Sequence, residues 1–435
     1  MGDDVLRLLR SYAEHRADAP GLAEALAFLS AVLLRPPPAP TLQPLNSSAS
    51  KKLLDSIMAV GFKAEWNAFP TPHPVPCRVM RAGLRLSTGE ITPMTVLVNE
   101  AGVPPLILTQ KGPRTLTGFV FQAMPVQLED PSAAEPVYQG SSERYAVKKI
   151  RKRTERPMAE DPRRELACLM WLKAMAETGE GRGGGLAGAA PPINLPLAVL
   201  EDTQNFYLVM PLLEEDFLDA FNRHLISARR GFSEQEAKGM LKDIVTGLAW
   251  LHALGVAHHD MSLENVMLNA HGQCVLIDFG QAIKVPVPSS AGAAKFAFQT
   301  RWPGSYGKAH YMAPELLNLE ARFAQSLGVT SNRSFDPLKA DMFALGVIMF
   351  ILVTGTTPWS FNGSGPNGMF RAVDLLRSPA YISMLTGGGI EGLSHAFAQG
   401  QLSEAAVDLV GRLLARDPAA RPTASEIQAH PWFSE

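Results

Sequence analysis

The hydrophobic pattern of the sequence changes near Ser233, and this change restricts the folds that the chain can adopt. Before it, short runs rich in β-branched residues alternate with glycine and proline, as in "TVLV" (95–98), "LILT" (106–109) and "GFVF" (118–121). Such runs are typical of strands. After it, the pattern is mostly helical, with an almost wholly apolar helix expected in "DMFALGVIMFILVTG" (341–355). Strands followed by helices indicate an α+β protein with two lobes.

Local signals define further elements. The run "ERYAVKKI" (143–150) predicts a strand, and "DPRRELACLMWLKAM" (161–175) has helical periodicity. Ser233 and Glu236 have the spacing of a capping box, which predicts that a helix begins there and reaches about Leu254. Two more strands are expected in "LAVLED" and "FYLVMPLL".

Proline-rich tracts separate the N-terminal part from the rest. Helical spacing within residues 4–34 ends at "RPPPAP", and a second helix is expected from Ser50 to about Val60, before "FPTPHPVP". The extension either packs on the main domain or binds a separate partner. The expected bounds are a helical and Pro-rich extension over 1–76 and a main domain over 77–435, with an N-lobe of about 77–213 and a C-lobe of about 214–435.

Composition narrows the class of protein. Hydrophobic residues make up 46% and charged residues 19% of the 435 residues, so we expect most of the chain to fold. The net charge of −2 gives no general attraction to nucleic acid or to an anionic membrane. The chain has 3 cysteines without a CxxC pair, no secretory signal pattern, and no apolar run near the ~20 residues of a membrane span. We expect a cytoplasmic protein without a membrane span or a nucleic-acid partner, and a nuclear location stays open.

Short motifs whose side chains could take part in catalysis occur in a distinctive order. In "HHDMSLENVML" a carboxylate, Asp260, precedes an amide, Asn265, by five positions, with Ser262 between them. Each motif alone is common by chance, whereas the full set in this order is specific. The other members are Lys148 in "AVK", Glu165, "IDFG" (277–280), "APE" (313–315), "DMFALG" (341–346) and Arg421.

This ordered set resembles the eukaryotic protein kinase family over roughly residues 105–433. The resemblance implies a β-rich N-lobe, a helical C-lobe, and ATP with Mg²⁺ bound between them. Phosphoryl transfer requires that charge on the triphosphate be neutralised and that the acceptor hydroxyl be held in line. We therefore expect a serine/threonine protein kinase that acts on a protein substrate.

The motif positions imply roles for the charged residues. Lys148 would bind the α- and β-phosphates while Glu165 fixes its flexible stem. Asp260 would be the catalytic base that orients the attacking hydroxyl. Asn265 and Asp278 would supply oxygen ligands for Mg²⁺.

The resemblance also implies an adenine site. Met210 has the gatekeeper position, Pro211 and Leu213 belong to the hinge, and Asp216 is placed to meet the ribose. Ala146 sets the phase of the strand that carries Lys148, so Lys149 should point to the opposite face. Glu315 and Arg421 match a buried ion pair that supports the activation segment.

The loop expected to cover the phosphates departs from the family pattern. Aligning "GFVFQA" on the family's G-x-V-x-x-A keeps Gly118 and Val120, but the first two glycines of G-x-G-x-x-G fall on Pro113 and Thr115. An insertion over 124–142 also separates this loop from Lys148. Side chains at those positions hinder the approach of backbone to phosphate, so the loop should hold ATP less closely. This departure favours a pseudokinase as the alternative function.

Three further departures concern the catalytic loop. His259 replaces the arginine that binds an activation-loop phosphate, so we expect activity without loop phosphorylation. Ser262 replaces the usual lysine, and Lys308 replaces the threonine of G-T-x-x-Y in "GKAHY" (307–311). The two chemical types are exchanged, which predicts that Lys308 reaches into the pocket and that Ser262 helps to hold it. The alternative is that Lys308 points to solvent.

Three functions stay open from the sequence. The first is an active serine/threonine protein kinase, and the second is a pseudokinase that acts as a nucleotide-binding scaffold or allosteric partner. The third is a kinase of small molecules, which "APE" and "DMFALG" disfavour because they build the peptide-docking region in the family. Retention of Lys148, Glu165, Asp260, Asn265 and Asp278 favours the first, since a pseudokinase has no chemical need for all of them.

Overall fold

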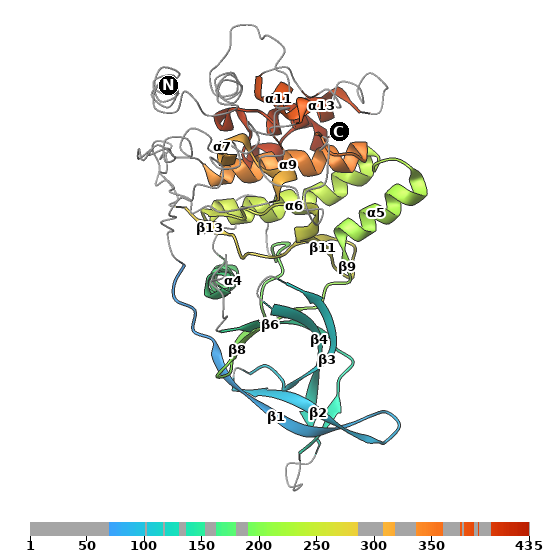
Figure 1. Cartoon of the computed structure of the whole chain (residues 1–435), viewed down its shortest axis with the longest axis vertical. Coiled ribbons are helices and arrows are strands. Elements are labelled where there is room, and N and C mark those ends of the chain that lie inside the picture. The colour runs from blue at the N-terminus through green and yellow to red at the C-terminus, as the bar shows by residue number, and fades with distance from the viewer. Residues whose placement is uncertain are drawn as a thin grey trace, which may run out of the picture. The chain divides into compact units, whose positions relative to one another are not determined.

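A computed structural model shows how these elements are arranged (Figure 1). The described part of the chain falls into two units, a strand-rich unit within 69–217 and 266–282 and a helical unit within 218–265 and 283–434. Most of the predicted extension, including both of its helices, lies outside the described residues. The structure describes residues 69–100, 102–115, 118–129, 136–152, 162–179, 190–285, 308–317, 336–359, 375, 378–386, 390 and 402–434.

The strand-rich unit contains an eight-stranded sheet and one long helix. The sheet order is β2-β3-β4-β5-β1-β7-β8-β6, with additional pairings β2–β1 and β4–β6. A smaller sheet has the order β12-β11-β9. The bounds are β1 Val75–Arg85, β2 Ile91–Asn99, β3 Leu106–Arg114, β4 Gly118–Leu128, β5 Val137–Gly140, β6 Tyr145–Arg151, α4 Pro162–Thr178, β7 Ala198–Glu201, β8 Asn205–Pro211, β9 Glu215–Asp216, β11 Val266–Leu268 and β12 Cys274–Leu276.

Strands β1 to β5 close into a ring, because β1 pairs with both β2 and β5. Figure 1 shows β1 and β2 at the lower end of this unit. Strand β1 pairs antiparallel with β2 over Cys77–Arg85 and parallel with β5 over Gly83–Arg85. Part of the segment predicted as an insertion therefore belongs to the sheet, because β4 continues to Leu128 and pairs there with β5. The ring encloses apolar side chains that include Ala82, Leu84, Val96, Ile107, Val126 and Tyr138.

A second apolar cluster supports the strands that carry the predicted nucleotide-binding residues. It includes Leu106, Ala123, Val147, Leu200 and Val209 from strands β3, β4, β6, β7 and β8. Buried and partly exposed residues alternate at the end of β6, where Lys148 is buried and Lys149 is not. Lys149 Nζ lies 5.6 Å from the ring centroid of Tyr207, away from the partner of Lys148. The phase predicted for this strand is confirmed.

The helical unit contains most of the helices. The predicted capping box at Ser233 is confirmed, because its side chain accepts from the Glu236 N–H and the Glu236 side chain accepts from the Ser233 N–H. The bounds are α5 Phe217–Ala228, α6 Glu234–Ala253, β10 Val256–Ala257, η1 Leu263–Asn265, β13 Ile283–Lys284, η2 Ala309–Tyr311, α7 Pro314–Leu317, α9 Pro337–Thr354, α11 Pro379–Thr386, α13 Glu404–Leu413, η4 Pro418–Ala420, α14 Ala424–Gln428 and α15 Pro431–Ser434.

Helix α9 is the central helix of this unit. Asp336 caps its N-terminus by accepting from the N–H of Leu338 and Lys339, and Gly355 ends it in the left-handed conformation at φ 76°. The helix is long and apolar enough to cross a membrane by length and composition, but 83% of the qualifying window is buried in the protein. Burial of that kind is typical of a core helix.

Candidate active site

Lys148 on β6 and Glu165 on α4 form a buried ion pair. Lys148 Nζ donates to Glu165 Oε1 at 2.6 Å and to Oε2 at 2.8 Å. Their side chains are only 9% and 5% exposed. Taking two charges out of water is costly, so each buried charge needs the other to compensate it. The pair also fixes the end of the flexible lysine side chain. The contact between these two residues is the one that the motif predicts.

Arg164, next to Glu165, ties the start of α4 to the segment after the "DFG" motif. Its Nη2 donates to the main-chain oxygen of Ala282 at 2.5 Å, with that of Gln281 at 3.5 Å. The predicted set of site residues did not include Arg164. Main-chain acceptors carry no side-chain signature, so no sequence pattern marks this contact.

Asp278 stands in the left-handed region of the backbone, at φ 62°. Its Oδ1 accepts from the N–H of Gly280 at 3.2 Å, while Phe279 between them is 1% exposed. A non-glycine residue rarely adopts such a φ, and residues held in this way cluster at functional sites. The anchored Phe279 and the turn at Gly280 hold the carboxylate of Asp278 in place.

The residues of the predicted adenine site lie on or next to strands of the strand-rich unit. Ala146 pairs with Met210, and Val120 pairs with Lys148 across β4 and β6. Pro211 ends β8, Leu213 follows it, and Asp216 pairs with Met267 in the small sheet. One neighbour was missed by sequence reasoning. The buried Asn194 directs its amide towards Met210, with Nδ2 3.9 Å from Sδ.

The turn between β3 and β4 is closed by its own hydrogen bonds. The N–H of Gly118 donates to Thr115 Oγ1 at 3.1 Å, and the N–H of Thr115 donates to the main-chain oxygen of Gly118 at 2.9 Å. Gly118 is needed for packing, because a Cβ there would lie 1.9 Å from the main-chain oxygen of Lys149. The glycine kept at 118 is thus explained by the close approach of β6.

The catalytic-loop candidates of the helical unit are joined directly. Asn265 Nδ2 donates to the main-chain oxygen of Asp260 at 2.7 Å and to its Oδ2 at 2.8 Å. The amide NH₂ is therefore used within the loop, and Asn265 Oδ1 is the atom that suits a cation. Oxygen donors of the asparagine and aspartate types, here Asn265 and Asp278, fit the preference of Mg²⁺.

Asp341, in the N-terminal part of α9, holds the main chain just before Asp260. Its carboxylate accepts from the N–H of His258 and of His259, both at 2.8 Å, and lies 2.9 Å from His252 Nε2. Burial raises the pKa of Asp341, but the hydrogen bonds from His252 and the main chain outweigh it and keep that pKa below its usual range. His259 has a left-handed φ of 64°, so the carboxylate fixes a strained part of the backbone.

Lys308, just before η2, reaches the catalytic loop. Its Nζ donates to Oγ of the fully buried Ser262 at 2.6 Å and lies 3.8 Å from Glu264 Oε2. A second contact docks the same segment, because Tyr311 Oη accepts from the N–H of Leu263 at 3.5 Å. Burial, and then the charge of Glu264, raises the pKa of Tyr311, so its phenol stays protonated. The solvent-pointing alternative for Lys308 does not describe this geometry.

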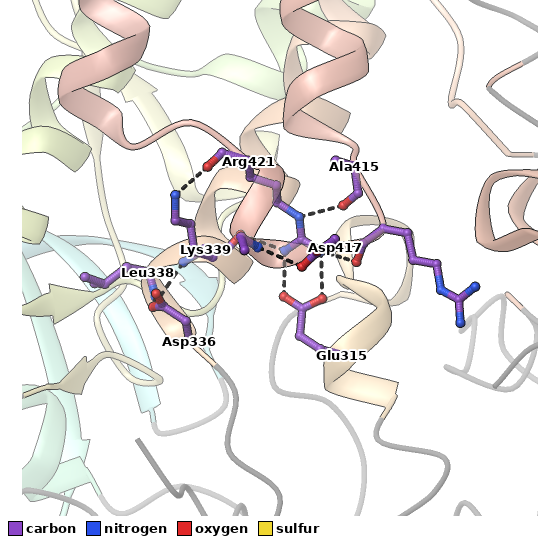
Figure 2. A network of polar contacts seen from close by, with 9 residues as sticks. Glu315, Asp336, Leu338, Lys339, Ala415, Asp417 and Arg421 are labelled. Carbon is purple, nitrogen blue, oxygen red and sulfur yellow. Dashed lines mark hydrogen bonds and ion pairs between the residues drawn. The ribbon is translucent and has the colours of Figure 1, made fainter. Parts of the chain in front are cut away.

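The predicted pair of Glu315 and Arg421 is present, with the Arg421 side chain fully buried and the Glu315 side chain 14% exposed (Figure 2). Arg421 Nη1 and Nη2 donate to the two carboxylate oxygens of Glu315 at 2.6 and 2.7 Å. The remaining N–H groups donate to main-chain oxygens of Ala415, Lys339 and Arg416 at 2.8, 2.9 and 3.3 Å. Every donor of the guanidinium has a partner. The residue therefore anchors α7, α9 and the α13–η4 connection together.

The predicted residues divide between the two units. The strand-rich unit contains Gly118, Val120, Ala146, Lys148, Glu165, Met210, Pro211, Leu213, Asp216 and Asp278, and the helical unit contains Asp260, Ser262, Asn265 and Lys308. Within the strand-rich unit Lys148 contacts Glu165. Within the helical unit Asn265 contacts Asp260, and Lys308 contacts Ser262.

Comparison with known families identifies the family of this chain. The family model for the protein kinase domain matches residues 191–433, more than half of the chain, and the chain therefore belongs to the protein kinase family. Its fold is the two-lobed α+β fold of that family. The match begins after β6 and α4, so Lys148 and Glu165 lie outside it. The assignment of these two residues depends on the geometry of their ion pair.

Several serine/threonine kinases are similar to this chain. The Calcium-dependent protein kinase 12 of Oryza sativa subsp. japonica is 30% identical over 302 residues, which are 67% of this chain and 44% of that protein. The Serine/threonine-protein kinase PEPKR2 of Arabidopsis thaliana is 29% identical over 236 residues, which are 54% and 40% of the two chains. The MAP kinase-interacting serine/threonine-protein kinase 1 of Xenopus tropicalis is 28% identical over 243 residues, 54% and 52% of the two. The alignments span about half or less of each relative's length.

Proposed function

We propose that this protein is an active serine/threonine protein kinase that transfers the γ-phosphoryl group of ATP to a protein hydroxyl. The observation that carries the proposal is the buried pair of Lys148 and Glu165, with Lys148 Nζ at 2.6 Å from Glu165 Oε1. A buried ion pair contributes little to stability by itself. Its presence on the strand and helix that the family uses for phosphate binding therefore supports a role in catalysis.

The residues have distinct tasks in the proposed reaction. Lys148 binds the α- and β-phosphates, and Asp260 orients the acceptor hydroxyl and takes its proton as the bond from oxygen to the γ-phosphorus forms. The bond from the γ-phosphorus to the ADP oxygen breaks, and ADP leaves. Asn265 and Asp278 would hold Mg²⁺, which neutralises charge on the triphosphate when bound.

One observation favours the second candidate, a pseudokinase. Thr115 closes the turn between β3 and β4 with its own hydroxyl, with the Gly118 N–H at 3.1 Å from Thr115 Oγ1. Backbone N–H groups that are already satisfied are poorly suited to bind phosphate. A pseudokinase of this kind would use the strand-rich unit as a nucleotide-binding or allosteric surface without transfer of phosphate.

Transfer of labelled phosphate to a generic acceptor protein distinguishes the two. We expect Mg²⁺-dependent transfer by the wild type and loss of at least about 10²-fold in Asp278→Ala, as is usual when a group that stabilises transition-state charge is removed. Equal signals from the two proteins would refute the kinase. Thermal melts with ATP, with and without Mg²⁺, then report binding, and a shift without transfer would identify the pseudokinase.

Regulation is tested by the same assay. His259 has no guanidinium with which to pair an activation-loop phosphate, so phosphatase-treated protein should keep most of its rate. A rate that collapses on dephosphorylation and returns on rephosphorylation would contradict this expectation.

A further inference from the structure

The catalytic loop between Asp260 and Asn265 is rich in negative charge and contains no lysine. Asp260 and Glu264 both lie on it. Ser262 stands at the position where the resemblance implies a lysine. A transferring phosphoryl group is itself anionic, so two neighbouring carboxylates oppose its binding. A cation from another segment is therefore needed to balance them.

Among the described residues, Lys308 brings such a charge to this loop. Its ammonium is 2.6 Å from Ser262 Oγ and 3.8 Å from Glu264 Oε2, and its side chain is 36% exposed. An ammonium has three donors. The hydroxyl takes one at short range and the carboxylate attracts a second at longer range. The geometry thus orients the ammonium on the loop and still permits an anionic ligand to approach it.

We propose that Lys308 is the catalytic lysine that contacts the γ-phosphate, and that Ser262 is its positioning residue. The proposal rests on the proposed function. In the reaction Lys308 makes and breaks no covalent bond; it neutralises charge on the oxygens of the group in transfer while Asp260 takes the acceptor proton. The chain has exchanged the chemical types of the two positions, with the hydroxyl at 262 and the ammonium at 308.

A purely structural role is the competing explanation, since Lys308 also docks η2 on the loop. Tyr311 provides an independent anchor for the same segment through its contact with the Leu263 N–H. The segment should therefore stay docked when Lys308 is made neutral, and loss of the charge should appear in kcat. Loss of a merely structural contact would appear in Tm.

Four variants test the exchange. Lys308→Met removes the charge and keeps most of the volume, Lys308→Thr with Ser262→Lys restores the family arrangement, Lys308→Thr alone is the reference for it, and Lys242→Met is the control for loss of an exposed lysine on α6. We expect kcat to fall about 10²–10³-fold in Lys308→Met and Lys308→Thr, with a smaller change in KM for ATP, and to recover at least about 10-fold in the double variant. Lys242→Met should match the wild type.

Two results would overturn the proposal. One is a kcat within about 3-fold of wild type in Lys308→Met, which is well below the usual cost of a lost transition-state contact. The other is a folded double variant, judged by its Tm, that is no faster than Lys308→Thr.

A binding measurement keeps this test separate from that of the proposed function. A contact with the γ-phosphate should favour MgATP over MgADP, and Lys308→Met should reduce that preference by roughly 10-fold, the usual value of a hydrogen bond between charged groups. If the wild type transfers no phosphate, the proposed function fails while this preference still tests Lys308. An unchanged preference would overturn the role of Lys308 alone.

Discussion

The strand-rich and helical units differ in where each departs from the pattern of the protein kinase family. The family match over 191–433 covers the described helical unit but begins after β6 and α4. In the strand-rich unit, strands β1 to β5 close into a ring outside the matched residues, and Pro113 and Thr115 stand where the resemblance places two phosphate-loop glycines. In the described part of the helical unit, the departures named above are the single residues His259, Ser262 and Lys308. Lys148, Asp260 and Asp278 thus keep the residue types of the family's motifs, whereas the first two glycines of its phosphate loop are replaced.

The largest expected effect breaks the anchoring of the helical unit. Arg421→Met leaves the Glu315 carboxylate and several main-chain oxygens without their donor, and should lower the free energy of unfolding by about 3–5 kcal/mol. Urea denaturation measures it. The control is Arg412→Met, because Arg412 is 59% exposed in its pair with Asp408 and should cost under about 1 kcal/mol. Equal shifts in the two variants would show that burial does not decide the value of the pair.

The next effect concerns the carboxylate that holds the catalytic loop. Asp341→Asn should cost about 1.5–3 kcal/mol at neutral pH, the usual value of hydrogen bonds to a charged group. The lowered pKa of Asp341 stabilises the fold fully above the ordinary carboxyl pKa of about 4, and this contribution is lost as the pH falls through the lower folded value. The stability gap between wild type and variant should therefore narrow below about pH 4. A gap that stays constant down to about pH 2 would contradict the assignment.

The same substitution should have opposite signs in the two units. In Gly118→Ala the new Cβ would lie 1.9 Å from the main-chain oxygen of Lys149, so β4 and β6 must separate, at a cost of about 1–3 kcal/mol. In Gly239→Ala, on the exposed face of α6, no atom lies within 4 Å of the new Cβ, and the gain should be about 0.5–1 kcal/mol. Paired thermal melts compare them. Loss of stability in both variants would refute the contrast.

The smallest effect concerns the loop over the phosphates. Thr115→Gly removes the hydroxyl that accepts from the Gly118 N–H and frees that donor for phosphate, so KM for ATP should fall by about 5-fold, the equivalent of one neutral hydrogen bond. Thr115→Ser keeps the hydroxyl and should leave KM unchanged. A fall of KM in the serine variant as well would show that the closed turn is not what weakens the loop.

Sequence reasoning predicted the contacts that depend on motif spacing. Lys148 with Glu165, Glu315 with Arg421, and the capping box at Ser233 are all present, because each follows from a local pattern or from a motif with a fixed partner. The bounds of the domains and the catalytic roles of the residues stay predictions.

What could not be predicted depends on partners without a local signal. Strand β5 has only 4 residues and joins β1 from 50 or so positions away, in a parallel register that no turn specifies. The sequence therefore indicates only an insertion over 124–142, whereas strands β4 and β5 pair within it. The contact of Asn194 with Met210 could not be predicted for the same reason, since neither residue belongs to a motif with a fixed partner.

The attachment of α4 has a consequence for how the sequence of this protein can change. Arg164 holds main-chain oxygens of Gln281 and Ala282, so substitutions or modifications of those two side chains leave the acceptor atoms in place. Through Arg164, the helix that carries Glu165 is thus linked to the backbone after Asp278 and not to the side chains of Gln281 and Ala282. Such a link tolerates substitutions in the segment. A change in the path of that backbone, for example on binding of another protein, would instead alter the contact with Arg164.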